Sequence, residues 1–128
     1  MKFFNKAFKT PSYFIFTILL MLSVSQSSLA HDQNAQTAWD KIDSGALVVD
    51  VRTAEEFAAG HLKNAINIPF EKIATGLEKR HISKDKSIVV YCRSGRRSGV
   101  ANETLIKEGY SNTYNGGGYE KLNAHTNK

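Results

Sequence analysis

The stretch Ser87-Ile-Val-Val-Tyr-Cys-Arg-Ser-Gly-Arg-Arg-Ser98 decides the fold of this chain. Its first part, residues 87–91, is a short apolar run rich in β-branched residues, which predicts a buried strand. Its second part is polar and contains Gly95, which accepts a positive φ and therefore favours a tight loop. The apolar spacing of residues 98–108 then predicts a helix. The stretch therefore predicts a strand, a loop and a helix in succession.

Similar patterns lie on both sides of this stretch. We expect further strands over residues 46–51, 65–68 and 112–115, and helices over residues 38–43, 53–59 and 70–80. Thr53-Ala-Glu-Glu56 fits a capping box at a helix start, and the glycines at 116–118 predict a turn into a last short helix. The helix over residues 98–108 is expected to bury Val100, Ala101, Thr104 and Leu105. Short buried strands that alternate with helices predict an α/β domain with a mostly parallel central sheet flanked by helices.

The first 30 of the 128 residues differ from the rest. Three lysines without an acidic residue precede the apolar run Tyr13–Val24, and Ser28-Leu29-Ala30 follows it. This layout predicts a signal peptide over residues 1–30 with cleavage before His31, and a retained membrane anchor is the alternative. We therefore expect an exported protein, periplasmic or secreted, with no membrane attachment after cleavage. A flexible segment over residues 31–36 and one domain over residues 37–125 complete the expected organisation.

The charge of the chain changes when the leader is set aside. The whole sequence has 17 basic and 12 acidic residues, and three of the basic ones belong to the leader. The remaining 14 basic and 12 acidic residues give a formal charge of +2. A balance so close to neutral does not support binding to nucleic acid.

Cys92 is the single cysteine of the sequence, so no internal disulfide is possible. A lone cysteine can be a small buried hydrophobic residue or a reactive thiol. Cys92 is expected to follow directly after the strand over residues 87–91, and ligands of parallel sheets bind beyond the carboxyl ends of the strands. The position of Cys92 therefore favours a functional site.

The loop after Cys92 has the chemistry of an anion site. A loop that leads into a helix presents unpaired backbone N–H groups, and it favours negative charge. Arg93, Arg96 and Arg97 add positive charge, and Ser94 and Gly95 complete the loop. Both features favour a thiolate, so we expect Cys92 to be a nucleophile with a lowered pKa. The alternative is an arginine-rich surface turn with solvated charges.

Two reaction classes use this arrangement of cysteine and arginine. Cysteine phosphatases and related arsenate reductases place an arginine six residues after the cysteine. Here Ser98 occupies that position, and Arg97 lies five residues after Cys92. The shorter loop favours a sulfur atom on the cysteine over a phosphoryl group.

Five motifs together resemble the rhodanese-like domain family, over roughly residues 35–123. They are Asp50-Val-Arg-Thr-Ala-Glu-Glu-Phe57, Gly60-His-Leu62, Ala65-Ile-Asn-Ile-Pro69, Tyr91-Cys-Arg-Ser-Gly-Arg-Arg-Ser98 and Gly117-Gly-Tyr-Glu120. Within that family the chain looks most like the small single-domain periplasmic thiosulfate sulfurtransferases. It departs from the family at Leu122, where a tryptophan is common.

The resemblance implies transfer of the outer sulfur of thiosulfate to a thiophilic acceptor, cyanide or a thiol, through a persulfide on Cys92. It implies that backbone N–H groups of residues 93–97 hold the sulfur and that Arg97 closes the loop. Arg93 and Arg96 are candidates for attracting the substrate, and the sequence does not separate their roles. Asp50, Arg52 and His61 are interpreted as scaffold residues near the site. We expect a monomer that needs no cofactor and no metal.

Two alternatives to the enzyme stay open at this point. A persulfide carrier would receive its sulfur from another protein. A binding module of the same family would have no catalytic activity, and such modules often lack the cysteine.

Overall fold

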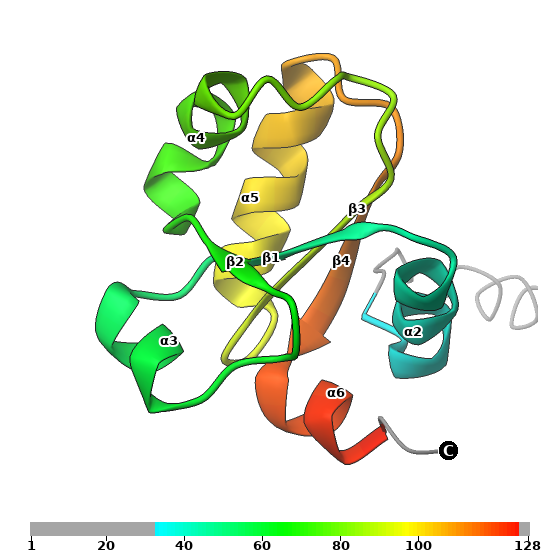
Figure 1. The fold of residues 1–128 in the computed structure, drawn as a ribbon, viewed down its shortest axis with the longest axis vertical. Helices are drawn as coiled ribbons and strands as arrows, with labels where there is room; N and C mark the ends of the chain where they lie inside the picture. Colours follow the sequence, from blue (N-terminus) through cyan, green and yellow to red (C-terminus); the bar gives the residue numbers. More distant parts are fainter. Residues whose placement is uncertain (1–32, 126–128) are drawn as a thin grey trace, which may run out of the picture. The chain divides into compact units, whose positions relative to one another are not determined.

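The computed structural model describes residues 33–125 (Figure 1), so the predicted signal peptide lies outside the described residues. Within residues 33–125 no helix has the length and the apolar content that crossing a bilayer requires. The elements follow in the order α2 (Ala35–Asp43), β1 (Leu47–Asp50), α3 (Ala54–Ala59), β2 (Ile66–Asn67), the 3₁₀ helix η1 (Phe70–Lys72), α4 (Ile73–Lys79), β3 (Ile88–Cys92), α5 (Arg96–Lys107), β4 (Thr113–Gly118) and α6 (Tyr119–His125).

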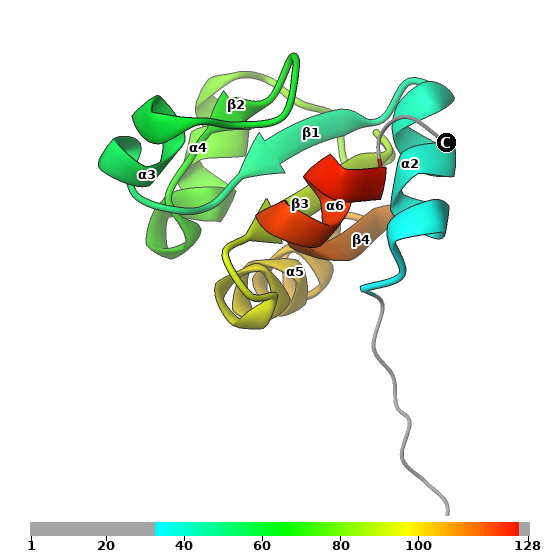
Figure 2. The same cartoon turned by 90° about the horizontal axis from the view of Figure 1, so that it is seen from below.

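The four strands form one sheet in the order β2-β1-β3-β4, and every neighbouring pair is parallel. Helices α5 and α6 lie on opposite sides of β3 and β4 (Figure 2). The predicted α/β architecture with a parallel sheet between helices is therefore confirmed. Because all strands are parallel, their carboxyl ends meet at one edge of the sheet, where β3 ends at Cys92.

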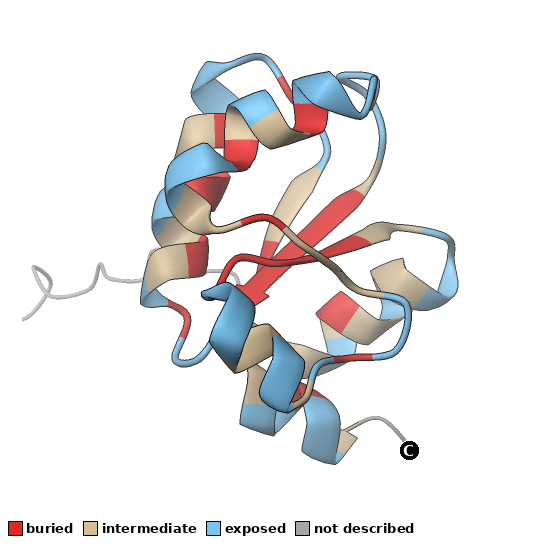
Figure 3. Cartoon of the chain, turned by 60° about the vertical axis from the view of Figure 1, so that its left-hand side comes forward, coloured by how far each residue is buried: buried red, intermediate tan, exposed pale blue. Residues whose placement is uncertain are grey.

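Strand β3 is buried along its whole length. Its side chains alternate between the two faces, as expected for a strand. Ile88, Val90 and Cys92 belong to the core beneath α4 and α5, whereas Val89 and Tyr91 belong to the core beneath α2 and α6. Figure 3 shows buried strands between helices whose outer surfaces are exposed. The reactive candidate Cys92 is thus directed to the face that α5 covers.

The predicted capping box at the start of α3 is present. The Thr53 hydroxyl accepts a hydrogen bond from the Glu56 N–H at 3.1 Å, and the Glu56 carboxylate accepts one from the Thr53 N–H at 3.0 Å. These bonds satisfy two N–H groups at the helix start. Helix α3 ends at Ala59 before Gly60, as predicted.

Three predicted helix starts are wrong by two or three residues. Helix α4 begins at Ile73 rather than at residue 70, because residues 70–72 form the 3₁₀ helix η1. Helix α2 begins at Ala35 rather than at residue 38, because the Asn34 side chain accepts a hydrogen bond from the Thr37 N–H and caps it. The flexible segment predicted over residues 31–36 is therefore helical at residues 35–36. Helix α5 begins at Arg96 rather than at Ser98, since Gly95 takes a left-handed conformation and acts as its N-cap.

The predicted inner face of α5 is also partly wrong. The helix buries Ser98, Ala101, Asn102 and Leu105, whereas Val100 is 40% exposed. The prediction followed apolar residues, but the helix turns two polar side chains toward the sheet. Ser98 is one of them, and it belongs to the site described below.

The glycines predicted as a turn belong to strand β4 instead. Val90 pairs with Asn115 and Tyr91 pairs with Gly117, so Gly116 is an extra residue in the ladder and forms a bulge. A Cβ atom on Gly116 would lie 2.9 Å from a Val89 methyl carbon. The glycine is needed because neighbouring strands come close together at the bulge.

Candidate active site

Cys92 is the last residue of β3, rather than the first residue after it, and its side chain is fully buried. Its sulfur accepts hydrogen bonds from the Gly95 N–H at 3.0 Å and the Ser98 N–H at 3.3 Å. The Ser98 hydroxyl lies 3.3 Å from the same sulfur. Gly95 has a φ of 101°, and this left-handed turn directs the first N–H groups of α5 toward Cys92. The predicted strand–loop–helix arrangement thus surrounds the sulfur with donors.

Opposing effects act on the pKa of Cys92, and the net result is a lowered pKa. Burial is the largest effect, and it raises the pKa because a thiolate loses its hydration. Hydrogen bonds from the Ser98 hydroxyl and from the N–H groups of Ser98, Gly95 and Ser94 lower it and outweigh the burial. The hydrogen bonds to the sulfur therefore favour a thiolate.

A buried polar network lies behind the loop. The Asn115 carbonyl oxygen is 2.7 Å from the Ser98 hydroxyl and accepts the Gly117 N–H at 3.0 Å. The Asn115 amide nitrogen donates to the Gly95 carbonyl at 3.2 Å. Asn115 therefore joins β4 to the start of α5. Sequence reasoning missed this residue because it precedes three glycines that were interpreted as a turn.

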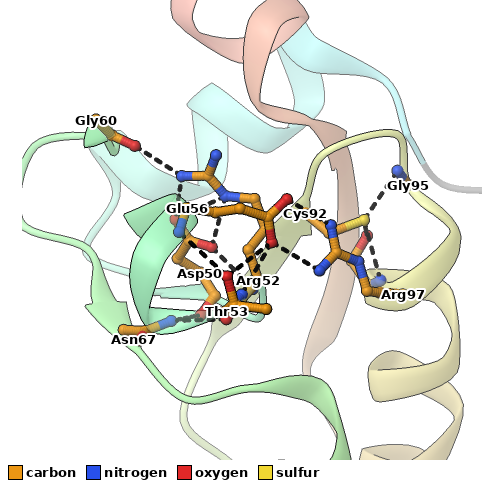
Figure 4. A network of polar contacts seen from close by, with 10 residues as sticks. Asp50, Arg52, Thr53, Glu56, Gly60, Asn67, Cys92, Gly95 and Arg97 are labelled. Atoms are coloured by element: carbon orange, nitrogen blue, oxygen red, sulfur yellow. Dashed lines mark hydrogen bonds and ion pairs between the residues drawn. The ribbon is translucent and has the colours of Figure 1, made fainter. Parts of the chain in front are cut away.

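Arg97 pairs with Glu56 of α3 (Figure 4). Its two terminal nitrogens lie 2.8 and 3.0 Å from the two carboxylate oxygens. The hydrogen bond from Arg97 is the main cause that lowers the pKa of Glu56 to about 2, and the Thr53 N–H adds to it. One carboxylate thus caps α3 and holds the start of α5. The sequence analysis identified the cap but not the partner of Arg97.

The other two loop arginines, Arg93 and Arg96, are exposed. Within residues 33–125 neither of them forms an ion pair. Arg93 borders two cavities, whereas Arg96 borders neither of them. The structure therefore separates two residues that the sequence analysis treated alike.

Asp50 and Arg52 form a buried pair at the end of β1, with 2.6 Å between a guanidinium nitrogen and a carboxylate oxygen. Arg52 also donates to the Gly60 carbonyl at 2.7 Å. Its guanidinium lies over the Tyr119 ring, 4.7 Å from the ring centroid. These contacts tie β1, the turn after α3 and α6 together beside the site.

His61 follows α3 and packs back against it. Its ring stacks on Phe57 with 3.7 Å between the ring centroids. Its Nδ1 is 2.8 Å from the Phe57 carbonyl oxygen. Both contacts fix the chain just after α3, and no contact with the Cys92 sulfur occurs within the described part of the chain.

A cavity of about 240 Å³ lies beside the loop at the carboxyl edge of the sheet. It is lined by Arg52, Glu56, Ala59, Gly60, Arg93, Tyr119 and Glu120. A second cavity of about 330 Å³ shares Arg93 and Glu120 with the first and extends along the glycines of β4. Residues 33–125 contain no group of three or more histidine, cysteine and acidic side chains that could hold a metal ion.

Comparison with known proteins gives consistent matches. Residues 34–125 match the family model described as Rhodanese-like domain. The chain is 35% identical over 74 residues to thiosulfate sulfurtransferase PspE of Escherichia coli strain K12. This alignment covers 58% of this chain and 71% of that protein. It is 32% identical over 96 residues to thiosulfate sulfurtransferase 16, chloroplastic, of Arabidopsis thaliana, with coverages of 67% and 80%. A solved rhodanese with anions from E. coli aligns with a TM-score of 0.57 and 34% identity over 59% of this chain and 89% of its own.

Proposed function

Because this chain belongs to the rhodanese-like domain family, we propose that it moves sulfur from thiosulfate to a thiophilic acceptor through a persulfide on Cys92. Sulfurtransferases among its relatives support sulfur transfer as the general activity. The observation that carries the proposal is the set of donors around one buried sulfur. The Gly95 and Ser98 N–H groups and the Ser98 hydroxyl all lie within 3.3 Å of it.

The reaction has two displacement steps. In the first, the Cys92 thiolate attacks the outer sulfur of thiosulfate, a bond from Sγ to that sulfur forms, and sulfite leaves with the electron pair of the broken S–S bond. In the second, the acceptor attacks the same outer sulfur, and Cys92 leaves as a thiolate. Cyanide becomes thiocyanate, and a thiolate acceptor becomes a persulfide. Cys92 returns to its starting state, so no external oxidant or reductant is needed.

Two arginines of the loop have separate roles in this proposal. Arg97 is held by Glu56, so it serves to keep the loop closed. Arg93 is exposed at the edge of the cavity and attracts the anionic donor. Ser94 and Gly95 contribute backbone N–H groups to the sulfur cradle. Asp50, Arg52 and His61 act as scaffold, since their contacts join β1, α3 and α6 around the site.

Three other functions use the same fold, and the residues around Cys92 bear on each of them. A phosphatase or arsenate reductase of this type uses an arginine where this chain has Ser98, and the Ser98 hydroxyl lies against the sulfur. A non-catalytic binding module does not require a lowered pKa at Cys92. A persulfide carrier uses the same chemistry and differs only in its sulfur donor.

The cellular setting of the activity is part of the proposal. The leader over residues 1–30 supports export to the periplasm, where the mature chain acts as a monomer on a small anionic donor.

The intact mass of purified residues 31–128 tests the proposal, measured before and after thiosulfate and again after cyanide. We expect a gain of one sulfur atom that cyanide removes. Cys92→Ser is expected to gain nothing and to keep its fold, because the change is small and local. Sulfur transfer by Cys92→Ser at a rate comparable to wild type would contradict the mechanism. No gain by a wild-type chain with reduced Cys92 would favour the binding module.

A further inference from the structure

The Ser98 hydroxyl lies between two acceptors. It is 3.3 Å from the Cys92 sulfur and 2.7 Å from the Asn115 carbonyl oxygen. Ser98 is fully buried and Asn115 nearly so, which makes the direction of a single hydrogen bond energetically important. A serine hydroxyl carries one proton, so it donates to one of these acceptors at a time.

The orientation of the Asn115 amide is fixed by its other contacts. Its nitrogen donates to the Gly95 carbonyl, and its oxygen accepts the Gly117 N–H. The oxygen cannot donate, so its contact with Ser98 is a hydrogen bond only when the serine proton points toward Asn115. In that orientation the serine oxygen is left as an acceptor for a protonated Cys92 thiol.

We propose that the Ser98 hydroxyl rotates with the charge on Cys92, donating to the sulfur when it is a thiolate and to Asn115 when it is neutral. This inference rests on the proposed persulfide reaction. Ser98 keeps its proton throughout, and only the direction of its O–H bond changes. Two backbone donors, the N–H groups of Gly95 and Ser98, stay on the sulfur in both orientations.

The rotation affects the two halves of the reaction differently. When the sulfur has been loaded, Sγ is neutral, and the hydroxyl points toward Asn115. When the acceptor attacks the outer sulfur, the Sγ–S bond breaks and negative charge returns to Sγ. The hydroxyl then turns back and stabilises the departing thiolate. A leaving thiolate of lower pKa departs faster, whereas an attacking thiolate of lower pKa is a weaker nucleophile. Ser98 therefore accelerates discharge rather than loading.

The test compares Ser98→Ala with Ser98→Thr, which restores a hydroxyl. The thiolate of Cys92 is titrated by its ultraviolet absorbance, and loading and discharge are each followed by intact mass in single turnovers above the pKa of every variant. We expect Ser98→Ala to raise the pKa of Cys92 by about one unit, because a hydrogen bond to a charged group is lost. Discharge is expected to slow about threefold, because the charge on the leaving sulfur is only about half developed in the transition state. Its loading rate is expected to stay equal to wild type or to rise, and Ser98→Thr is expected to recover both values.

Asn115→Ala distinguishes this role from a merely structural one. With its second acceptor removed, the Ser98 hydroxyl can donate only to the sulfur, so the pKa of Cys92 is expected to fall. A loop that is simply loosened would raise the pKa in both variants. Ser83→Ala serves as the control and should leave the pKa of Cys92 unchanged. The Ser83 hydroxyl is exposed and donates to Asp85. Both residues precede β3, whereas Cys92 lies at the other end of that strand.

An unchanged pKa in Ser98→Ala, or equal losses in loading and discharge, would overturn the inference. A pKa that rises in Asn115→Ala would also overturn it. Failure of the wild-type chain to gain sulfur would instead overturn the proposed function. The titration of the Ser98 and Asn115 variants would then decide by itself whether the hydroxyl follows the charge.

Discussion

Cys92 is held between burial, which favours the neutral thiol, and a set of short-range donors that favours the thiolate. Most of these donors are backbone groups, whose positions follow from the left-handed turn at Gly95 and the start of α5. Among the charged side chains of the loop, Arg97 pairs with Glu56 and Arg93 lines the cavity. In the proposed mechanism, hydrogen bonds stabilise the sulfur and Arg93 attracts the substrate.

The two exposed loop arginines are expected to differ in their effect on substrate binding. Arg93→Gln should raise the KM for thiosulfate up to about fivefold with little change in kcat, since an exposed charge contributes less than about 1 kcal/mol. Arg96→Gln should have a smaller effect, because Arg96 borders neither cavity. Steady-state assays of the two variants at low salt measure the difference. Equal KM values in both variants would contradict a special role for Arg93.

Helices α3 and α5 are connected by the Glu56–Arg97 pair, whose side chains are 27% and 23% exposed. The pKa of Glu56 is lowered from 4.5 to about 2 in the folded chain, so its charge stabilises the fold above about pH 4.5. This contribution is lost as the pH falls through the folded pKa of about 2. Since the pair is partly exposed to solvent, we expect it to contribute about 1 kcal/mol.

Replacement of Glu56 by glutamine keeps an acceptor for the capping box and removes the charge. Glu56→Gln should therefore lower the free energy of unfolding by about 1 kcal/mol at neutral pH. The difference from wild type should shrink as the pH is lowered from about 4.5 toward 2. Urea denaturation of both proteins over this pH range measures it. A difference that stays constant with pH would show that shape, and not charge, is what Glu56 supplies.

The buried Asp50–Arg52 pair connects several elements of the domain. Arg52 contacts the carboxylate of Asp50, the carbonyl of Gly60, the ring of Tyr119 and, at 5.7 Å from its centroid, the ring of Tyr91. Asp50→Asn leaves the Arg52 charge buried without its counter-ion. We expect the free energy of unfolding to fall by about 3–5 kcal/mol, as for other buried pairs that lose one partner.

Urea denaturation at neutral pH measures this loss, and Glu103→Gln provides the control. Glu103 is an exposed acidic residue of α5, so its change should stay within about 0.5 kcal/mol. Similar losses in the two variants would show that the buried pair adds no more than a surface charge.

Much of the domain could be predicted from local patterns. The β-branched run over residues 87–91 predicted the central strand, and Thr53-Ala-Glu-Glu56 predicted the start of α3. Both signals depend on a few neighbouring residues. Local patterns failed at Val100 and at Gly116–Gly118, because burial in α5 and the bulge in β4 depend on the strand that each element packs against.

The sequence by itself determined the parallel α/β fold, the position of Cys92 at the end of a buried strand, and the loop of glycine and arginines that follows it. Only the tertiary structure decided how these groups are paired. Glu56 meets Arg97 across 41 residues, Asn115 meets Ser98 across 17, and a Cβ on Gly118 would lie 2.6 Å from the Arg93 carbonyl oxygen. The physical reason is that a residue's own neighbours set its backbone conformation, whereas strand register and helix packing set which distant side chains come within hydrogen-bonding distance.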